Sequence, residues 1–287
     1  MSPYGVVALR TSFAAGLLFL VIFLYKRPFL YIYPAGLLGC LLAGLINGVG
    51  SLFYYGSLSR IDASLGQLLY SLYPLFVVIF LWMDGQPPSR VTLLRLFLIV
   101  PALYLLTRAD FKEVDLGGVL MMLAGSALYA MHLPVNQRVL YDMPAPTVTL
   151  YTLLAMSGVV VPAYFISLLF GNTPIFPALN QAWGPVLGLT MVTFLSRLML
   201  FLGVKNLGGM QTALLGLGEM LVTLLSSFFL LGERLSWQQW LGALILLICL
   251  GLVALDKTPP ARRRRVSWLN WVRPPGLPKD MPWPMDQ

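Results

Sequence analysis

The sequence predicts an all-α polytopic membrane protein, on the basis of its composition and the length of its apolar runs. Of the 287 residues, 58% are hydrophobic and 10% are charged, whereas a soluble domain carries roughly 25% charged residues. So few charges cannot cover a water-facing surface, which excludes a soluble enzyme, a secreted disulfide scaffold and a disordered chain. The apolar runs are about twenty residues long, enough to cross a bilayer core as helices, and they lack the alternation of barrel strands.

Nine apolar runs are expected to form transmembrane helices. Short connections that carry helix-breaking residues separate them, such as Lys26-Arg27-Pro28 and Gly85-Gln86-Pro87-Pro88. The predicted spans are residues 4–25, 34–56, 63–83, 91–107, 116–135, 146–170, 184–204, 208–231 and 237–255.

Two spans of the first half carry a signal for packing or bending. Gly44 and Gly48 in span 34–56 form a small-xxx-small face, which favours close contact with another helix. Pro74 in span 63–83 predicts a kink, because proline has no backbone N–H and leaves one carbonyl unpaired. In the second half, spans 116–135 and 208–231 carry polar stripes.

The two halves resemble each other at an offset near 147 residues. Residues 52–56 (LFYYG) match residues 199–203 (MLFLG), and span 63–83 matches 210–231. A repeat of five helices, an odd number, must lie inverted relative to its copy, which is the plan of many secondary transporters. We expect a first repeat at 1–108 with four helices, a second at 115–256 with five, and a tail at 257–287. The first repeat lacks a counterpart of helix 116–135, so the natural protein is expected to have one more helix before Met1.

Several short motifs stand out near the two ends of the chain. They are Gly218-Glu219-Met220, Leu231-Gly232-Glu233-Arg234-Leu235-Ser236, Gly242, and the stretch from Ser2-Pro3-Tyr4 to Leu9-Arg10. With these motifs the second repeat resembles the end of an EamA-type repeat of the drug/metabolite transporter superfamily. The resemblance implies ten helices in two inverted five-helix repeats, both termini in the cytoplasm, and transport of small metabolites. This chain departs from the pattern by lacking the first helix, and by having Glu219-Met220 for Glu-Pro and Gly85-Gln86 for Gly-Glu.

Four ionisable side chains fall at membrane depth, where each costs about 2.5–3.5 kcal/mol on insertion scales and needs a partner or a purpose. They are Glu219, Arg197, His132 and Arg10. Glu219 shares a polar helix face with Thr212, Gly216, Thr223 and Ser226. Either this face lines a cavity in which Glu219 binds substrate or a proton, or Glu219 pairs with Arg197 to lock two helices together.

Further substrate-binding candidates lie in the first repeat. Gln67 lies on a stripe of span 63–83 with Ser64, Ser71 and Pro74, and Tyr70 and Tyr73 flank this stripe. Asn47 lies in the glycine-rich run of span 34–56. Each is equally compatible with plain helix packing. Arginine and glutamate in one cavity suit a zwitterion such as an amino acid, which is one pairing among several.

The basic tail sets the expected orientation. It carries seven Lys or Arg and three Asp from Asp256 onward, which places the C-terminus in the cytoplasm and, with nine spans, Met1 outside. Its arginines are expected to bind anionic lipid headgroups, with a solvated tail as the alternative; no nucleic-acid partner is expected. These arginines are Arg262, Arg263, Arg264 and Arg265.

The sequence thus predicts a secondary active transporter in a bacterial plasma membrane, exporting a small organic metabolite by alternating access, with proton coupling as an option. We expect no enzyme activity, metal or cofactor, since the chain has one His, and Cys40 and Cys249 lie inside apolar runs. A membrane-embedded enzyme acting on a lipid or isoprenoid, and a non-transporting scaffold subunit, are the alternatives. A homodimer is one assembly that the sequence leaves open.

Overall fold

The computed structural model describes residues 3–107, 115–170, 183–230 and 236–252. Throughout these residues the secondary structure is helical, and no strand occurs among them. The elements are α1 (Pro3–Tyr25), the short helix η1 (Arg27–Leu30), α2 (Pro34–Ser57), α3 (Ala63–Tyr70), α4 (Tyr73–Met83), α5 (Arg90–Thr107), α6 (Leu116–Leu140), α7 (Ala145–Phe170), α8 (Trp183–Leu207), α9 (Gly209–Gly216), α10 (Gly218–Leu230) and α11 (Trp237–Gly251).

Each predicted span is helical over the residues that the structure describes, and seven segments among them are long and apolar enough to cross a membrane. They comprise α1, α2, α6, α7 and α8, together with the two segments in which α3 continues as α4 and α9 as α10. The all-α membrane fold is therefore confirmed. The main difference in extent is α6, which continues past residue 135 to Leu140 and includes Pro134.

Two spans that were expected to be single helices are interrupted. The first breaks between Tyr70 and Tyr73, as the proline at 74 predicts, and the second breaks at Leu217. Ser71 and Leu217 are 146 residues apart, close to the repeat offset. The structure thus places one discontinuous helix in each half, at matching positions.

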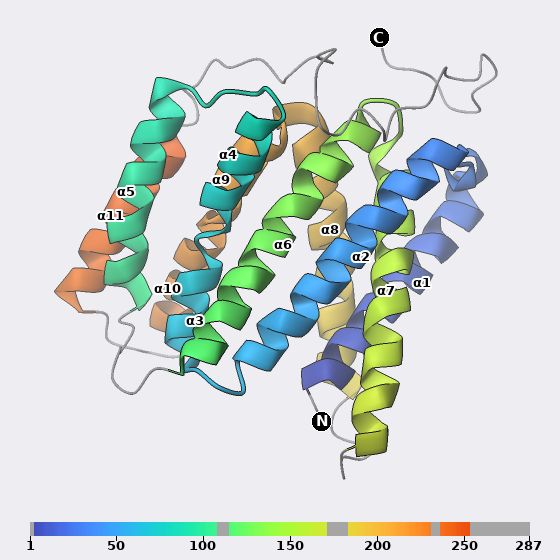
Figure 1. Ribbon diagram of the computed structural model, residues 1–287, viewed down its shortest axis with the longest axis horizontal. Helices are drawn as coiled ribbons and strands as arrows, with labels where there is room; N and C mark the ends of the chain where they lie inside the picture. The colour runs from blue at the N-terminus through green and yellow to red at the C-terminus, as the bar shows by residue number, and fades with distance from the viewer. Residues whose placement is uncertain (1–2, 108–114, 171–182, 231–235, 253–287) are drawn as a thin grey trace.

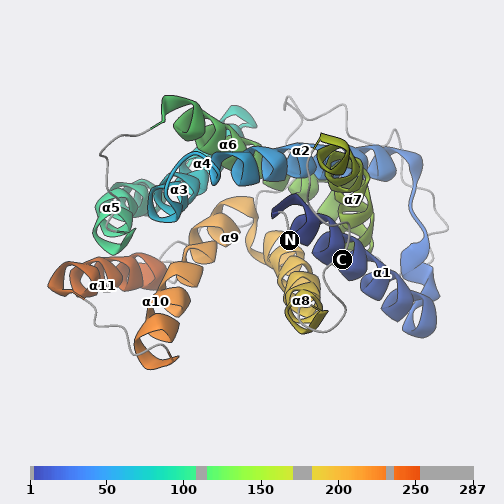
Figure 2. The ribbon, with the colours of Figure 1, turned by 90° about the horizontal axis from the view of Figure 1, so that it is seen from below.

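The helices form two groups that face each other across the molecule. Seen from below in Figure 2, α2, α3, α4 and α6 lie along one side, whereas α8, α9 and α10 lie along the other. The pair α5 and α11 packs together at one end of the long axis, and α1 and α7 pack together at the opposite end.

Glycines of α2 allow close contact with α7. A Cβ at Gly44 of α2 would lie 2.6 Å from the carbonyl oxygen of Thr152 and 2.9 Å from the backbone nitrogen of Met156, both in α7. A Cβ at Gly48 would lie 2.7 Å from that of Val159. The small-xxx-small face of α2 is therefore buried directly against α7, as expected for such a face.

Polar contacts hold the helix ends at both edges of the bundle. At the first end (the lower edge of Figure 1), the Ser57 hydroxyl donates to the Gly118 carbonyl oxygen over 2.7 Å, and Arg60 lies 3.7 Å from Asp115. The second end is the opposite edge, where α4, α6 and α9 meet. The groups that hold the second end are Asp84, Gln86, Gln137, Arg138 and the backbone N–H of Gly209.

Candidate functional site

Two cavities lie inside the bundle, with volumes of about 740 and 630 Å³. Five side chains line both of them, and we call these five the central layer. The central layer consists of Arg10 from α1, Tyr70 from α3, Tyr129 from α6, Arg197 from α8 and Glu219 from α10. These residues come from five different helices: α3 and α6 of one group, α8 and α10 of the other, and α1 at one end of the long axis.

The two cavities extend from the central layer in different directions. The larger one passes Asn47 and Gln67 and reaches Ser64 and Leu58 beside the turn between α2 and α3, at the first end. The smaller one follows α8 as far as Leu207 and has α9 on its other side. The central layer is therefore a partition between two spaces inside the protein.

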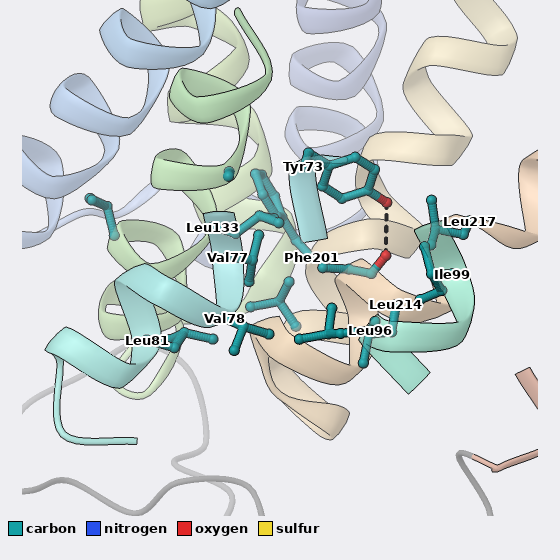
Figure 3. Packing of buried hydrophobic residues seen from close by; sticks show 14 of the residues in the cluster. Tyr73, Val77, Val78, Leu81, Leu96, Ile99, Leu133, Phe201, Leu214 and Leu217 are labelled. Carbon is teal, nitrogen blue, oxygen red and sulfur yellow. Dashed lines mark hydrogen bonds between the residues drawn. The ribbon is translucent and has the colours of Figure 1, made fainter. Parts of the chain in front are cut away.

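The two interrupted helices form part of this partition, and each has one released carbonyl group satisfied by a hydroxyl. Pro74 cannot donate to the Tyr70 carbonyl oxygen, which instead accepts from the Ser126 hydroxyl over 3.0 Å. At the second break, the Leu217 N–H donates to the Leu215 carbonyl oxygen instead of the Ala213 carbonyl oxygen. The Ala213 carbonyl oxygen accepts from the Tyr73 hydroxyl over 2.8 Å, the bond drawn in Figure 3.

Side chains near the breaks also touch each other. The Gln67 amide lies 3.3 Å from the sulfur of Met220, and the Ser71 hydroxyl lies 3.8 Å from the same atom. Paired interruptions of this kind are where inverted-repeat carriers place their substrate sites, because unwound backbone offers polar groups at membrane depth.

Glu219 occupies the first turn of α10, directly after the break. The free N–H groups at a helix N-terminus carry partial positive charge, which stabilises a carboxylate there. The side chain is exposed to both cavities. In the chain as described, no ion pair joins Glu219 to Arg197; the two charges line the same cavities without locking the helices together.

The two arginines of the central layer rest on tyrosine rings. The Arg197 guanidinium lies 5.7 Å from the centre of the Tyr129 ring, and that of Arg10 lies 6.0 Å from the centre of the Tyr55 ring. One nitrogen on each, Nη1 of Arg197 and Nε of Arg10, is buried and finds no hydrogen-bond partner among the described residues. Each guanidinium group therefore carries one donor that the described residues leave unsatisfied.

His132 lies outside both cavities. Its ring is fully buried, with Nδ1 in contact with the Tyr129 carbonyl oxygen and the ring centre 4.7 Å from that of Tyr129. It also packs near Phe201 of α8. In this conformation His132 therefore packs against Tyr129 without lining either cavity.

A cluster of tyrosines surrounds the central layer, and the sequence analysis missed three of its members. Tyr70 lies 4.8 Å from Tyr54 and 5.5 Å from Tyr129, measured between ring centres, and Tyr73 lies 5.1 Å from Tyr129. The missed residues are Tyr54, Tyr55 and Tyr129. The available signal for Tyr129 was its place one turn before His132 on the same helix face.

The structure thus gathers most of the predicted site residues. The central layer includes Arg10, Tyr70, Arg197 and Glu219; Asn47 and Gln67 line the larger cavity, and Tyr73 lines the smaller one. The predicted lipid-binding residues Arg262, Arg263, Arg264 and Arg265 lie outside the described residues.

Apolar membrane-spanning helices around a partitioned polar cavity define a membrane transporter. A sequence profile of the EamA-like transporter family matches residues 1–108 and 116–255, and the chain therefore belongs to that family. It is 23% identical over 255 residues to the uncharacterized transporter YcbK of Bacillus subtilis (strain 168), covering 84% of this chain and 80% of the relative. A protein of known crystal structure shares the fold, with a TM-score of 0.73 at 15% identity, over 89% of this chain and 88% of the other.

Proposed function

We propose that the chain is a secondary active transporter that exports a small organic metabolite across a bacterial plasma membrane by alternating access. The observation that carries this proposal is the central layer: one set of side chains lines two cavities, so a solute bound there is accessible from either space in turn. The family and the name of the relative favour a transporter over a membrane-embedded enzyme or a scaffold.

In this proposal, polar contacts at the second end must break when the transporter opens on that side. Arg138 lies 2.7 Å from Asp84, and the side-chain oxygen of Gln137 accepts from the Gly209 N–H over 2.9 Å. These contacts join α4 of the first half to α6 and α9 of the second. In the present conformation the larger cavity reaches the first end, and the smaller one extends along α8 to Leu207 near the second end. In this proposal the contacts at the second end break when that side opens fully.

Glu219 is the coupling group in this proposal. Its carboxylate lies on the partition between the cavities, so it can take up a proton from one space and release it to the other. Protonation changes the charge of the central layer by one unit, which alters its affinity for a charged solute in step with the proton.

The test uses proteoliposomes and a panel of radiolabelled metabolites, with and without a pH gradient. Glu219→Gln keeps the side-chain shape and removes the charge, so gradient-driven flux should fall at least tenfold while the protein still folds and inserts. Glu219→Asp should retain part of the flux, and Asp115→Asn, at the exposed first end, should retain all of it. If Glu219→Gln transports at the normal rate with the same pH dependence, Glu219 is a packing residue.

The tail serves orientation and lipid contact in this proposal. Four consecutive arginines beside a membrane attract anionic headgroups with about 1 kcal/mol each, which keeps the C-terminus in the cytoplasm. A peptide of residues 257–287 should bind vesicles containing anionic lipid, and replacing Arg262, Arg263, Arg264 and Arg265 by alanine should weaken binding most at low salt. Equal binding by both peptides would remove lipid contact from the proposal.

A further inference from the structure

We propose that the central layer binds an organic carboxylate with a planar apolar body, held between Arg10 and Arg197 and stacked on the tyrosine cluster. The assignment of substrate class rests on the proposed transport function. The chemistry is that of a monoanion, in contrast to the zwitterion that one arginine and one glutamate would suit.

The charge of the cavities favours an anion. Among the described residues, the charged side chains that line them are Arg10, Arg197 and Glu219, and each lines both. With Glu219 ionised, the lining carries one positive charge in excess. A zwitterion would neutralise one arginine and the glutamate and leave the second arginine without a counter-charge, whereas a monoanion balances the site.

The hydrogen-bond donors of the two arginines favour a carboxylate in particular. Nη1 of Arg197 and Nε of Arg10 are buried and have no partner within the described part of the chain. A buried charged donor without an acceptor is costly, and a carboxylate supplies two acceptor oxygens that suit guanidinium groups. No ion pair holds either arginine in the described part of the chain, where the pairs are Arg138–Asp84 and Arg60–Asp115; Glu219, which lines the same cavities, offsets one of the two positive charges.

The aromatic surroundings favour a planar body attached to that carboxylate. Tyr54, Tyr70 and Tyr129 form a continuous group with ring centres 4.8 and 5.5 Å apart, and all three line the larger cavity. Aromatic groups pair with one another in offset or edge-to-face geometry at such distances. The cavity volume of about 740 Å³ accommodates a ring and a short chain.

Binding to the purified full-length protein tests the class of ligand without requiring transport. The probe is 3-phenylpropanoate, measured by calorimetry in lipid nanodiscs. Its neutral amide removes the charge, hexanoate removes the ring, and phenylalanine adds an ammonium group. We expect the amide and hexanoate each to bind at least tenfold more weakly than the probe, and phenylalanine to bind more weakly as well.

Variants assign the binding to the central layer. Arg197→Gln and Arg10→Gln should each weaken binding of 3-phenylpropanoate at least tenfold, whereas Arg60→Gln, at the exposed first end, should leave it unchanged. Arg197→Lys keeps the charge and should bind better than Arg197→Gln, which separates loss of charge from misfolding. Glu219→Gln should not weaken binding of this anion, although it should weaken binding of a zwitterion.

The proposal is overturned if the amide binds as well as the acid, if phenylalanine binds at least as tightly as 3-phenylpropanoate, or if no carboxylate binds. Failure of transport is a separate result: proteoliposomes that move amines or amino acids but no carboxylate would retain the transport function and reject this substrate class. Binding of 3-phenylpropanoate without flux of any solute would retain this ligand class and reject the transport function.

Discussion

The hydroxyl of Tyr73 lies 2.8 Å from the carbonyl oxygen of Ala213 and joins the two interrupted helices of the protein. Tyr73 is the first residue of α4, and Ala213 precedes the break at Leu217 by one turn. A side chain at one break therefore satisfies a backbone group that the other break releases, and the two halves of the chain depend on each other at this point.

The first prediction concerns this bond. Tyr73→Phe keeps the ring and leaves the Ala213 carbonyl oxygen without its donor, which should lower the free energy of unfolding by about 1 kcal/mol. The measurement is an unfolding titration in mixed detergent micelles. Tyr25→Phe, at a phenol that is exposed at the end of α1, is the matched control and should unfold as wild type does. An equal stability of Tyr73→Phe and Tyr25→Phe would show that the bond contributes nothing.

The second prediction concerns the break before α4. Ser126→Ala should destabilise the protein by about 1–2 kcal/mol, because the partly buried Tyr70 carbonyl oxygen loses its donor. Pro74→Ala restores a backbone N–H that can donate to the same oxygen, so the loss in Ser126→Ala should shrink by more than half in the Pro74→Ala background. Ser157→Ala serves as control, since that hydroxyl bonds to Leu153 of its own helix. Additive effects in the double variant would contradict the assignment.

The third prediction compares two Arg–Asp pairs of different burial. The side chains of Asp84 and Arg138 are 1% and 9% exposed, whereas those of Asp115 and Arg60 are 45% and 53% exposed. Removing one partner of a buried pair strands the other charge, so Asp84→Asn should cost about 3–5 kcal/mol. Asp115→Asn should cost at most about 1 kcal/mol. Thermal unfolding in detergent measures both, and similar melting temperatures for the two variants would refute the distinction.

The fourth prediction concerns the contact of α2 with α7. Gly44→Ala places a methyl group against the Thr152 carbonyl oxygen and the Met156 nitrogen, which are backbone atoms and cannot rotate away. We expect a loss of about 1–3 kcal/mol from overpacking. Gly158→Ala, where a Cβ would meet nothing within 4 Å, should leave the unfolding transition in place. If both alanine variants unfold alike, α2 and α7 move apart to accommodate the methyl group at no cost in the free energy of unfolding.

Much of the fold could be predicted from sequence because hydrophobic length and helix breakers are local signals. Pro74 has a direct steric effect on its own helix, and the break at residues 71–72 followed from it. The break at Leu217 has no proline; flanking glycines at 216 and 218 are a weaker signal, since glycine also serves close packing. The Tyr73 hydroxyl, which satisfies the Ala213 carbonyl oxygen at this break, comes from a residue distant in sequence. The position of the break could therefore be identified only from the folded structure.

The site could be predicted only in part, because some of its residues carry a local signal in the sequence and others do not. Glu219 and Arg197 could be singled out because a charge in an apolar run is unusual. Tyr129 and Tyr54 could not, because a tyrosine in a transmembrane helix commonly packs, and only the meeting of helices shows which ones line a cavity. His132 is the converse case: its chemistry drew attention, yet its ring is buried behind Tyr129.

The hydroxyl bonds at the two breaks also determine how the protein can bend. A continuous helix in hydrocarbon resists flexing, because every ladder bond that opens leaves a peptide group with no water to bind. Here ladder bonds are already missing at Tyr70 and Ala213, and Ser126 and Tyr73 have taken their place. The two breaks are therefore the places where these helices can bend at the least cost in backbone hydrogen bonds, and residues beside both breaks line the two cavities.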